Sequence, residues 1–108
     1  MSKIPPLNLS NFNQSVLEAS FKEPIVVDFW AEWCAPCRLI SPILESLRQE
    51  YGFSIYGVDV DTEQDLARQY AIRSIPTILI FSHGKIVQTI IGAQSKDKIL
   101  AAIQAAAQ

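Results

Sequence analysis

The fold of this chain is decided by the stretch Ile25-Val26-Val27-Asp28-Phe29-Trp30-Ala31-Glu32-Trp33-Cys34-Ala35-Pro36-Cys37. Residues 25–31 are mostly β-branched or aromatic, which is the composition of a strand covered on both faces. The two cysteines are the only ones in the chain, and a helical pattern begins at the first of them. A lone Cys-x-x-Cys where a strand passes into a helix indicates a redox dithiol.

The spacing and position of the cysteines explain this interpretation. Residues i and i+3 lie on one face of a helical turn, so the sulfurs of Cys34 and Cys37 can close a small ring. At a helix start, unpaired N–H groups and the helix dipole favour the thiolate of Cys34, which is the form that attacks disulfides. We therefore expect Cys34 to be the nucleophile and Cys37, one turn further in and more shielded, to be the resolving thiol.

Two other uses of the cysteines are weaker hypotheses. A free cysteine can serve as a small buried hydrophobic residue, but the polar position of Cys34 and the second cysteine argue against this use. A zinc site needs about four ligands, and besides the cysteines the chain offers only His83 in a remote turn. We expect no metal and no cofactor other than a redox-active Cys34–Cys37 disulfide.

Length and composition indicate one domain over residues 1–108, with 49% hydrophobic residues to form its core. The net charge of -2 provides no basic surface for nucleic acid or anionic membranes. No apolar stretch approaches the ~20 residues that span a bilayer, and residues 1–6 contain no signal-peptide core. We expect a cytoplasmic protein, although a removed presequence would leave no trace. Two cysteines in a reducing compartment favour transient, catalytic pairing.

Apolar periodicity predicts four helices and four strands. We expect helices over 11–19, 34–51, 62–70 and 96–106, and strands over 25–31, 54–60, 77–81 and 85–91. Short turns join these elements, and the strand at 25–31 is the candidate for the central position. The strands at 25–31 and 54–60 should pair in parallel through a right-handed crossover. The last two strands should form a hairpin in which Gly84 adopts a positive φ.

Helix ends are assigned from capping residues. Ser10 and Ser95 precede the first and last helices, and Gly52 follows the second. Thr62, with Asp65 three residues later, resembles a capping box for the third helix. In the second helix, Pro42 should cause a kink. The expected buried positions of that helix are Leu39, Ile40, Ile43, Leu44 and Leu47.

Several motifs together closely resemble the thioredoxin family. They are Val27–Cys37, Pro42, Ile72–Thr77, Phe81, Gly84 and Gly92. The resemblance covers nearly the whole chain and implies the α/β thioredoxin fold, a five-stranded mixed β-sheet flanked by four α-helices. It also implies a monomeric protein-disulfide reductase that cycles through mixed disulfides with target proteins. A thioredoxin reductase, linked to NADPH or to ferredoxin, would then restore the dithiol.

Asp28 interrupts an otherwise apolar strand. Burial without a partner should raise the pKa of its carboxyl group, although an interior Asp bonded to a cap or to water would also fit the sequence. The resemblance implies that Asp28 accepts the proton of Cys37. Family members often carry a lysine at the position of Gly57, near this acid, so the surroundings of Asp28 should differ here.

The resemblance also implies a groove for substrate. A cis Ile75-Pro76 bond would pack against the dithiol and leave the backbone of Ile75 free to pair with an extended segment. Gly92 and Ala93 would form the opposite wall. Trp33 should be exposed, with Ala35, Pro36 and Ile75 beside it, whereas Trp30 should pack in the core. Pro36 and Ala35, which stands where the family usually has glycine, would tune the reduction potential.

Two competing functions remain open from sequence alone. An oxidant or isomerase could share this fold, although such proteins favour a histidine between the cysteines and act outside the cytosol. A binding subunit could use the fold as a surface with dispensable thiols. The reduction potential separates the first alternative from a reductase, and replacement of both cysteines by serine separates the second.

Overall fold

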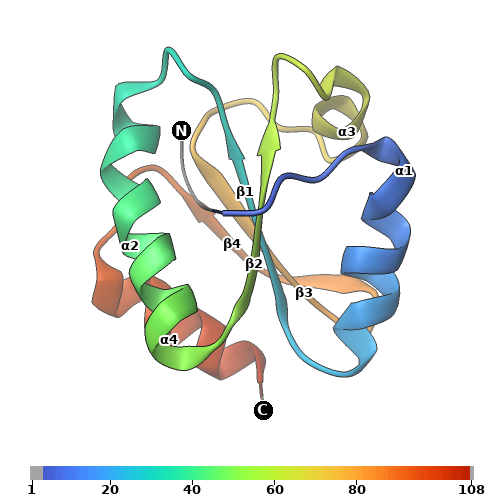
Figure 1. Cartoon of the computed structure of the whole chain (residues 1–108), viewed down its shortest axis with the longest axis vertical. Helices are drawn as coiled ribbons and strands as arrows, with labels where there is room; N and C mark the ends of the chain where they lie inside the picture. The colour runs from blue at the N-terminus through green and yellow to red at the C-terminus, as the bar shows by residue number, and fades with distance from the viewer. Residues whose placement is uncertain (1–3, 108) are drawn as a thin grey trace.

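A four-stranded mixed sheet lies at the centre of the computed structural model, which describes residues 4–107 (Figure 1). The strands are β1 (Ile25–Trp30), β2 (Ser54–Asp59), β3 (Thr77–Ser82) and β4 (Lys85–Ile91). They lie side by side in the order β2-β1-β3-β4, with β1 parallel to β2 and antiparallel to β3, and β4 antiparallel to β3. The expected central position of β1 and its parallel pairing with β2 are confirmed.

Helices cover both faces of the sheet. The helices α2 (Ala35–Tyr51) and α4 (Lys96–Ala106) lie together on one face, and α1 (Leu9–Phe12) and α3 (Gln64–Gln69) lie on the other (Figure 1). Each face has its own core. The α2 and α4 side buries Val26, Ile40, Leu44, Leu47, Ile55, Ile78, Ile80, Ile99 and Ile103, and the opposite side buries Phe12, Val16, Ile25, Val27, Phe29, Val58, Leu66, Leu79 and Phe81.

The predicted fifth strand is absent from the described residues. Near the N-terminus, Pro6 forms only an isolated parallel bridge with Gly57. Gly57 N donates to Pro5 O at 2.9 Å, and Leu7 N donates to Gly57 O at 2.8 Å. Since Pro5 and Pro6 have no N–H group to donate, this segment cannot build a longer ladder along the edge of β2. The mixed sheet and the four α-helices agree with the expected fold, but the sheet has four strands.

The first helix begins earlier than expected. Its N-cap is Asn8, whose side-chain oxygen accepts from the backbone N–H groups of Ser10 (2.9 Å) and Asn11 (3.0 Å). The Asn11 side chain in turn accepts from Asn8 N at 2.8 Å, which completes a reciprocal capping box. Ser10 is therefore inside the helix, and its assignment as the cap was wrong. The helical path continues to residue 21, through a π-helical turn at Asn13–Glu18 and a 3₁₀ turn at Ala19–Phe21.

Of the other three predicted caps, Gly52 and Ser95 are confirmed and Thr62 is wrong. Gly52 ends α2 with φ 71°, and Ser95 Oγ accepts from Lys98 N at 3.2 Å at the start of α4, both as expected. The capping box predicted at Thr62 was wrong, because α3 starts after Glu63 without a side-chain cap. The Thr62 hydroxyl instead donates to the carbonyl of Asp59 at 3.3 Å, so this side chain stabilises the preceding turn.

The second helix buries one stripe and leaves one predicted core residue outside. Ile40, Leu44 and Leu47 are fully buried, but Leu39 is 68% exposed. Successive helical positions differ by about 100°, so Leu39 lies at the border of the stripe that Ile40 defines. The helix continues through Pro42 without a break, and the kink expected there stays a prediction.

The β3–β4 hairpin has the predicted turn. His83 (φ 54°) and Gly84 (φ 77°) both have positive φ between the paired residues Ser82 and Lys85. Two consecutive positive φ values are the signature of a type I′ turn, which matches the twist of the flanking strands. The turn lies at the end of the molecule opposite the start of α2 (Figure 1).

Candidate active site

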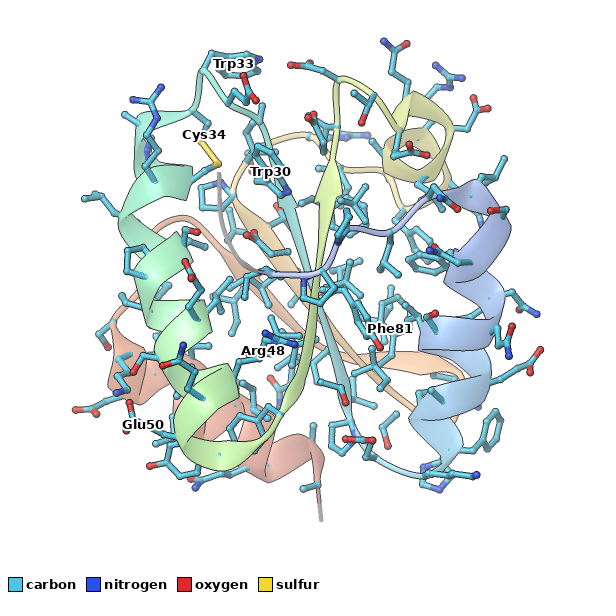
Figure 2. The ribbon with its side chains drawn as sticks, viewed as in Figure 1. Trp30, Trp33, Cys34, Arg48, Glu50 and Phe81 are labelled. Atoms are coloured by element: carbon cyan, nitrogen blue, oxygen red, sulfur yellow. A yellow bond between two sulfur atoms is a disulfide. The ribbon has the colours of Figure 1, made fainter. Side chains whose placement is uncertain are left out.

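Cys34 and Cys37 form a disulfide at the start of α2, with their Cα atoms 5.3 Å apart (Figure 2). Cys34 has extended backbone angles and is the N-cap of α2, and Ala35 and Pro36 are the first two helical residues. The backbone N–H of Cys37 points at the sulfur of Cys34, with an N–Sγ distance of 3.2 Å. The prediction that one helical turn brings the two sulfurs together is confirmed. An N–H group of the helix start, which has no backbone partner within the helix, donates to Cys34 Sγ.

The two sulfurs differ in exposure. Cys37 is fully buried and Cys34 is 4% exposed, whereas Ala35 and Pro36 between them are exposed. Both cysteines pack with Ala31, and the side chains around this group are Trp30, Val60 and Ile75. Cys34 is thus the slightly more exposed of two buried cysteines, and Cys37 is fully enclosed by protein.

Asp28 lies in the middle of β1, between Gly57 on β2 and Ile78 on β3. It is only 3% exposed, and among the described residues its Oδ1 has no hydrogen-bond partner. Burial raises the pKa of this carboxyl group from 3.8 to about 7. The structure therefore agrees with the predicted rise in pKa and shows no capping group at Oδ1. A carboxyl group with this pKa can gain or lose a proton at neutral pH.

The position of Asp28 relative to the disulfide follows from the alternation of side chains along β1. Asp28 and Trp30 are two residues apart, so their side chains lie on the same face of the sheet. Trp30 packs against the group that contains Cys34 and Cys37. Asp28 is therefore on the side of the sheet that carries α2 and the disulfide.

The Trp30 indole fills space beside Gly57, the position where family members often carry a lysine. A Cβ atom built on Gly57 would lie 3.0 Å from Trp30 Nε1, closer than side chains normally pack. The indole therefore occupies the space next to position 57 and lies along a groove of about 340 Å³. Trp30 is half-buried, so the expectation of simple core packing was only partly right (Figure 2). The groove is lined by Ile4, Pro6, Leu7, Asn8, Trp30, Gly57, Asp59, Thr62 and Glu63.

The two predicted walls of a groove lie next to each other. The Ile75-Pro76 bond is cis, as predicted. Pro76 is buried, and the half-buried Ile75 packs against the cysteines. Gly92 N donates to Pro76 O at 2.9 Å, which fixes the loop of Gly92 (φ 86°) and the exposed Ala93 beside the proline loop.

Trp33 is exposed, as predicted, and its orientation depends on a residue that sequence reasoning missed. Its side chain lies near the start of α2 (Figure 2). It is 67% exposed, and its Nε1–H donates to Asp61 Oδ2 at 2.9 Å. Asp61 follows β2, whose C-terminal end lies beside the C-terminal end of β1 because the two strands are parallel. The run of acids at 59–65, placed directly after a predicted parallel strand, was the available signal.

Within residues 4–107, no group of three or more His, Cys, Asp or Glu side chains is arranged to hold a metal ion. In the same range, no helix combines the length and apolar character needed to cross a bilayer. The Cys34–Cys37 disulfide is the redox centre that the structure provides.

Comparison with known proteins identifies the family. The family model described as thioredoxin matches residues 3–105. The chain belongs to the thioredoxin family. It is 43% identical to thioredoxin 1 of Synechococcus elongatus over 98 residues, an alignment that covers 89% of this chain and 90% of that protein. It is 44% identical to thioredoxin of Porphyra purpurea over 93 residues, covering 78% of this chain and 87% of the relative.

A plant relative is slightly more distant. The chain is 39% identical over 106 residues to the chloroplastic M-type thioredoxin of Spinacia oleracea, covering 96% of this chain and 58% of that protein. Thioredoxins are thiol-disulfide oxidoreductases, and this chain has the Cys-x-x-Cys disulfide on which that chemistry depends. It is therefore a protein-disulfide reductase.

Proposed function

We propose that residues 1–108 act as one domain that reduces disulfides of target proteins in two steps at Cys34. First, the Cys34 thiolate attacks one sulfur of the target disulfide, forming a mixed disulfide and releasing the other target sulfur as a thiolate. Then Cys37 gives up its proton and attacks the Cys34 sulfur. This step forms the Cys34–Cys37 disulfide and releases the second target thiol. The observation that carries this order is that Cys34 is the N-cap of α2 and the more exposed of the two cysteines, while Cys37 is fully buried.

In this proposal Asp28 accepts the proton of Cys37. Its carboxyl group has a pKa of about 7 because it is buried, and it shares the α2 side of the sheet with the disulfide. A base with a pKa near the working pH can both accept a proton during resolution and return it when the dithiol is restored. Asp28 has no lysine at position 57 to hold it ionised.

The target binds across the exposed residues around the disulfide. Trp33, Ala35 and Pro36 provide apolar surface beside Cys34, and Ile75 offers backbone for pairing with an extended segment of the target. Pro76, Gly92 and Ala93 form the other side, which the Gly92–Pro76 hydrogen bond supports. Ala35 and Pro36 influence the relative stability of dithiol and disulfide, and so the reduction potential.

We also propose the remaining parts of the cycle, which the family resemblance and the composition of the chain suggest. A thioredoxin reductase, linked to NADPH or to ferredoxin, supplies two electrons and two protons to restore the dithiol. The protein acts as a monomer, in the cytoplasm, without nucleic acid, membrane or cofactor. Activity assays with each reductase type test the electron donor. Sedimentation of the pure protein tests the monomeric state, and cell fractionation tests the location.

Trapping tests the central proposal. In a Cys37→Ser variant, mixed disulfides with target proteins should persist through Cys34 and dissolve when a reductant is added. A Cys34→Ser variant is the matched control and should trap nothing. Targets trapped through Cys37 instead would show that the assigned order is wrong. A reduction potential as high as that of disulfide oxidants would contradict the assigned direction.

A further inference from the structure

Arg38 reaches back across the start of α2 to the loop that carries Cys34. It is the fourth residue of the helix, and its Nη2 donates to the backbone carbonyl of Glu32 at 2.7 Å. Side chains of a helix tilt toward its N-terminus, and residues four apart are neighbours on its surface. Arg38 is four residues after Cys34, so the hydrogen bond holds its guanidinium beside the first turn of the helix.

The carbonyl that holds Arg38 belongs to a tight turn that ends at Cys34. Cys34 N donates to Ala31 O at 3.2 Å, so residues 31–34 fold back on themselves. Glu32 lies inside this turn, and the Cys34 sulfur accepts from Cys37 N at 3.2 Å. A donor with positive charge makes a stronger bond to a carbonyl than a neutral donor does. The charged end of Arg38 is thus bonded to the turn that positions the reactive sulfur.

A positive charge at the start of a helix is unfavourable unless an anion lies nearby. The N-terminus of α2 already has partial positive charge from its unpaired N–H groups and from the helix dipole. Neither of the ion pairs found among residues 4–107 includes Arg38. In the oxidised protein the Cys34 sulfur carries no charge. The anion that suits this position is the Cys34 thiolate, which forms when the disulfide is reduced.

The other charged groups near Cys34 are mostly acidic. Carboxylates beside a thiol disfavour its ionised form, whereas a cation favours it. Of the two arginines in this region, Arg38 is the one that is bonded to the turn of Cys34. Besides Arg38, the titratable groups around Cys34 are Glu32 in its own turn, Cys37 in α2, Asp28 on β1, Asp59 and Asp61 at and after the end of β2, and Arg73 before β3.

We propose that Arg38 is a positioning residue for the first step of disulfide reduction: its guanidinium, held on the carbonyl of Glu32, stabilises the Cys34 thiolate that attacks the target. The inference rests on the proposed function, because it assigns a charge that supports the nucleophile named there. The guanidinium is already in place in the oxidised protein, so Arg38 does not have to be reorganised when the thiolate forms. Since Arg38 is exposed, salt should weaken its effect.

Replacement of Arg38 by methionine removes the charge and keeps a long unbranched side chain. Rates of Cys34 alkylation by iodoacetamide in the reduced protein, followed by mass spectrometry between pH 5 and 10, give the pKa of this thiol. At about 0.1 M salt the pKa should be about 0.5 higher in Arg38→Met than in wild type, and the difference should fall below about 0.2 in about 1 M salt. Arg38→Lys keeps the charge and should move the pKa by less than half as much.

The matched control is Arg48→Met, which makes the same change in the last turn of α2 (Figure 2). Its pKa for Cys34 should stay within about 0.1 of wild type, because Arg48 lies about two Debye lengths from Cys34 at about 0.1 M salt. The comparison separates a local charge from any effect that an arginine has on the helix as a whole.

The rate of attack on a disulfide provides a second signature. Second-order rates of reduction of one peptide disulfide by the reduced protein are measured in stopped flow. A higher thiol pKa lowers the thiolate fraction at low pH but makes the thiolate a stronger nucleophile, so Arg38→Met should be about twofold slower than wild type at pH 6 and about 1.5-fold faster at pH 9. If the variant were slower at both pH values, a structural loss would explain the effect and the inference would be wrong.

The outcomes separate this inference from the proposed function. Failure of the wild-type protein to reduce the peptide would contradict the reductase function and, with it, the role of Arg38. An unchanged Cys34 pKa in Arg38→Met, or equal shifts in Arg38→Met and Arg48→Met, would overturn the inference and leave that function intact. A shift as large in Arg38→Lys as in Arg38→Met would also overturn it, because the effect would then depend on the bond to Glu32 and not on the charge.

Discussion

Trp30 Nε1 lies 3.0 Å from the point that a Cβ atom on Gly57 would occupy. The two residues are on adjacent parallel strands, and Gly57 is the register partner of Asp28. The indole therefore uses space that any side chain at position 57 would need. The position of the Trp30 indole thus depends on residue 57 being glycine. Both residues lie next to the buried Asp28.

Replacement of Gly57 by alanine tests this relationship. The added methyl group should force the Trp30 ring to move by a few tenths of an ångström. Because the ring is half-buried beside a groove, the free energy of unfolding should fall by only about 1 kcal/mol, the low end of what overpacking costs. In a Trp30→Phe background the smaller ring should remove most of this penalty. Urea unfolding of the two single variants and the double variant measures the coupling. Additive effects would show that the two residues do not compete for space.

Asp28 should make stability depend on pH. Between pH 4 and 7 the unfolded chain has released this proton, but the folded protein retains it because burial raises the pKa from 3.8 to about 7. The free energy of unfolding should therefore fall as pH rises through this window, by on the order of 4 kcal/mol, and level off above pH 7. Asp28→Asn should remove this dependence and be more stable than wild type at pH 8.

Unfolding curves of the oxidised protein at pH 5, 6, 7 and 8 provide the measurement. Asp97→Asn, which removes an exposed acid, is the control and should retain the wild-type slope between pH 5 and 8. If wild type and Asp28→Asn have parallel pH profiles, the carboxyl group of Asp28 titrates alike in both states and the assigned burial effect is wrong.

The same residue should control the resolution step. In wild type the rate at which Cys37 releases a bound target should rise with pH around 7, as Asp28 becomes ionised and able to accept a proton. Asp28→Asn should slow this step at pH 8 by about a hundredfold, which is the low end of the effect that loss of a general base usually has. Rapid-quench analysis of a preformed mixed disulfide isolates resolution from the first attack. An unchanged rate and pH profile in the variant would exclude the base role.

The first helix offers a test of local stability. Asn8→Ala removes a side chain that accepts two backbone hydrogen bonds and should lower the free energy of unfolding by about 1 kcal/mol. Glu63→Ala is the matched control, because Glu63 is also an N-cap but makes no capping bond, and its effect should stay within about 0.5 kcal/mol. Equal losses in the two variants would mean that the capping box contributes nothing specific.

Sequence reasoning located the redox centre and most elements because their signals are local. Runs of apolar residues placed β1 to β4, and apolar residues at helical spacing placed α4, within one or two residues. Ser95 and Gly52 marked their helix ends correctly. The cysteine spacing predicted a disulfide that a single helical turn can close. The cis bond before Pro76 came from the family resemblance, since the residues alone favour the trans form.

Competing local signals explain the incorrect assignments. Asn8 and Ser10 are both good caps, and the reciprocal bond to Asn11 decides for Asn8. Thr62 has the spacing of a capping box, but its hydroxyl bonds backward to Asp59 instead. The exposure of Leu39 depends on how α2 is rotated against the sheet, which its own sequence leaves ambiguous.

The sequence by itself determined the chemistry: two cysteines one turn apart at a helix start, after a strand that carries a single acid. These features depend on backbone geometry within a few residues, so they can be read locally. The tertiary structure decided that Asp61 orients Trp33 and that Trp30 fills the space beside Gly57. It also placed the acids after β2 around Trp33, because only the parallel pairing of β1 with β2 brings these distant segments to one end of the sheet.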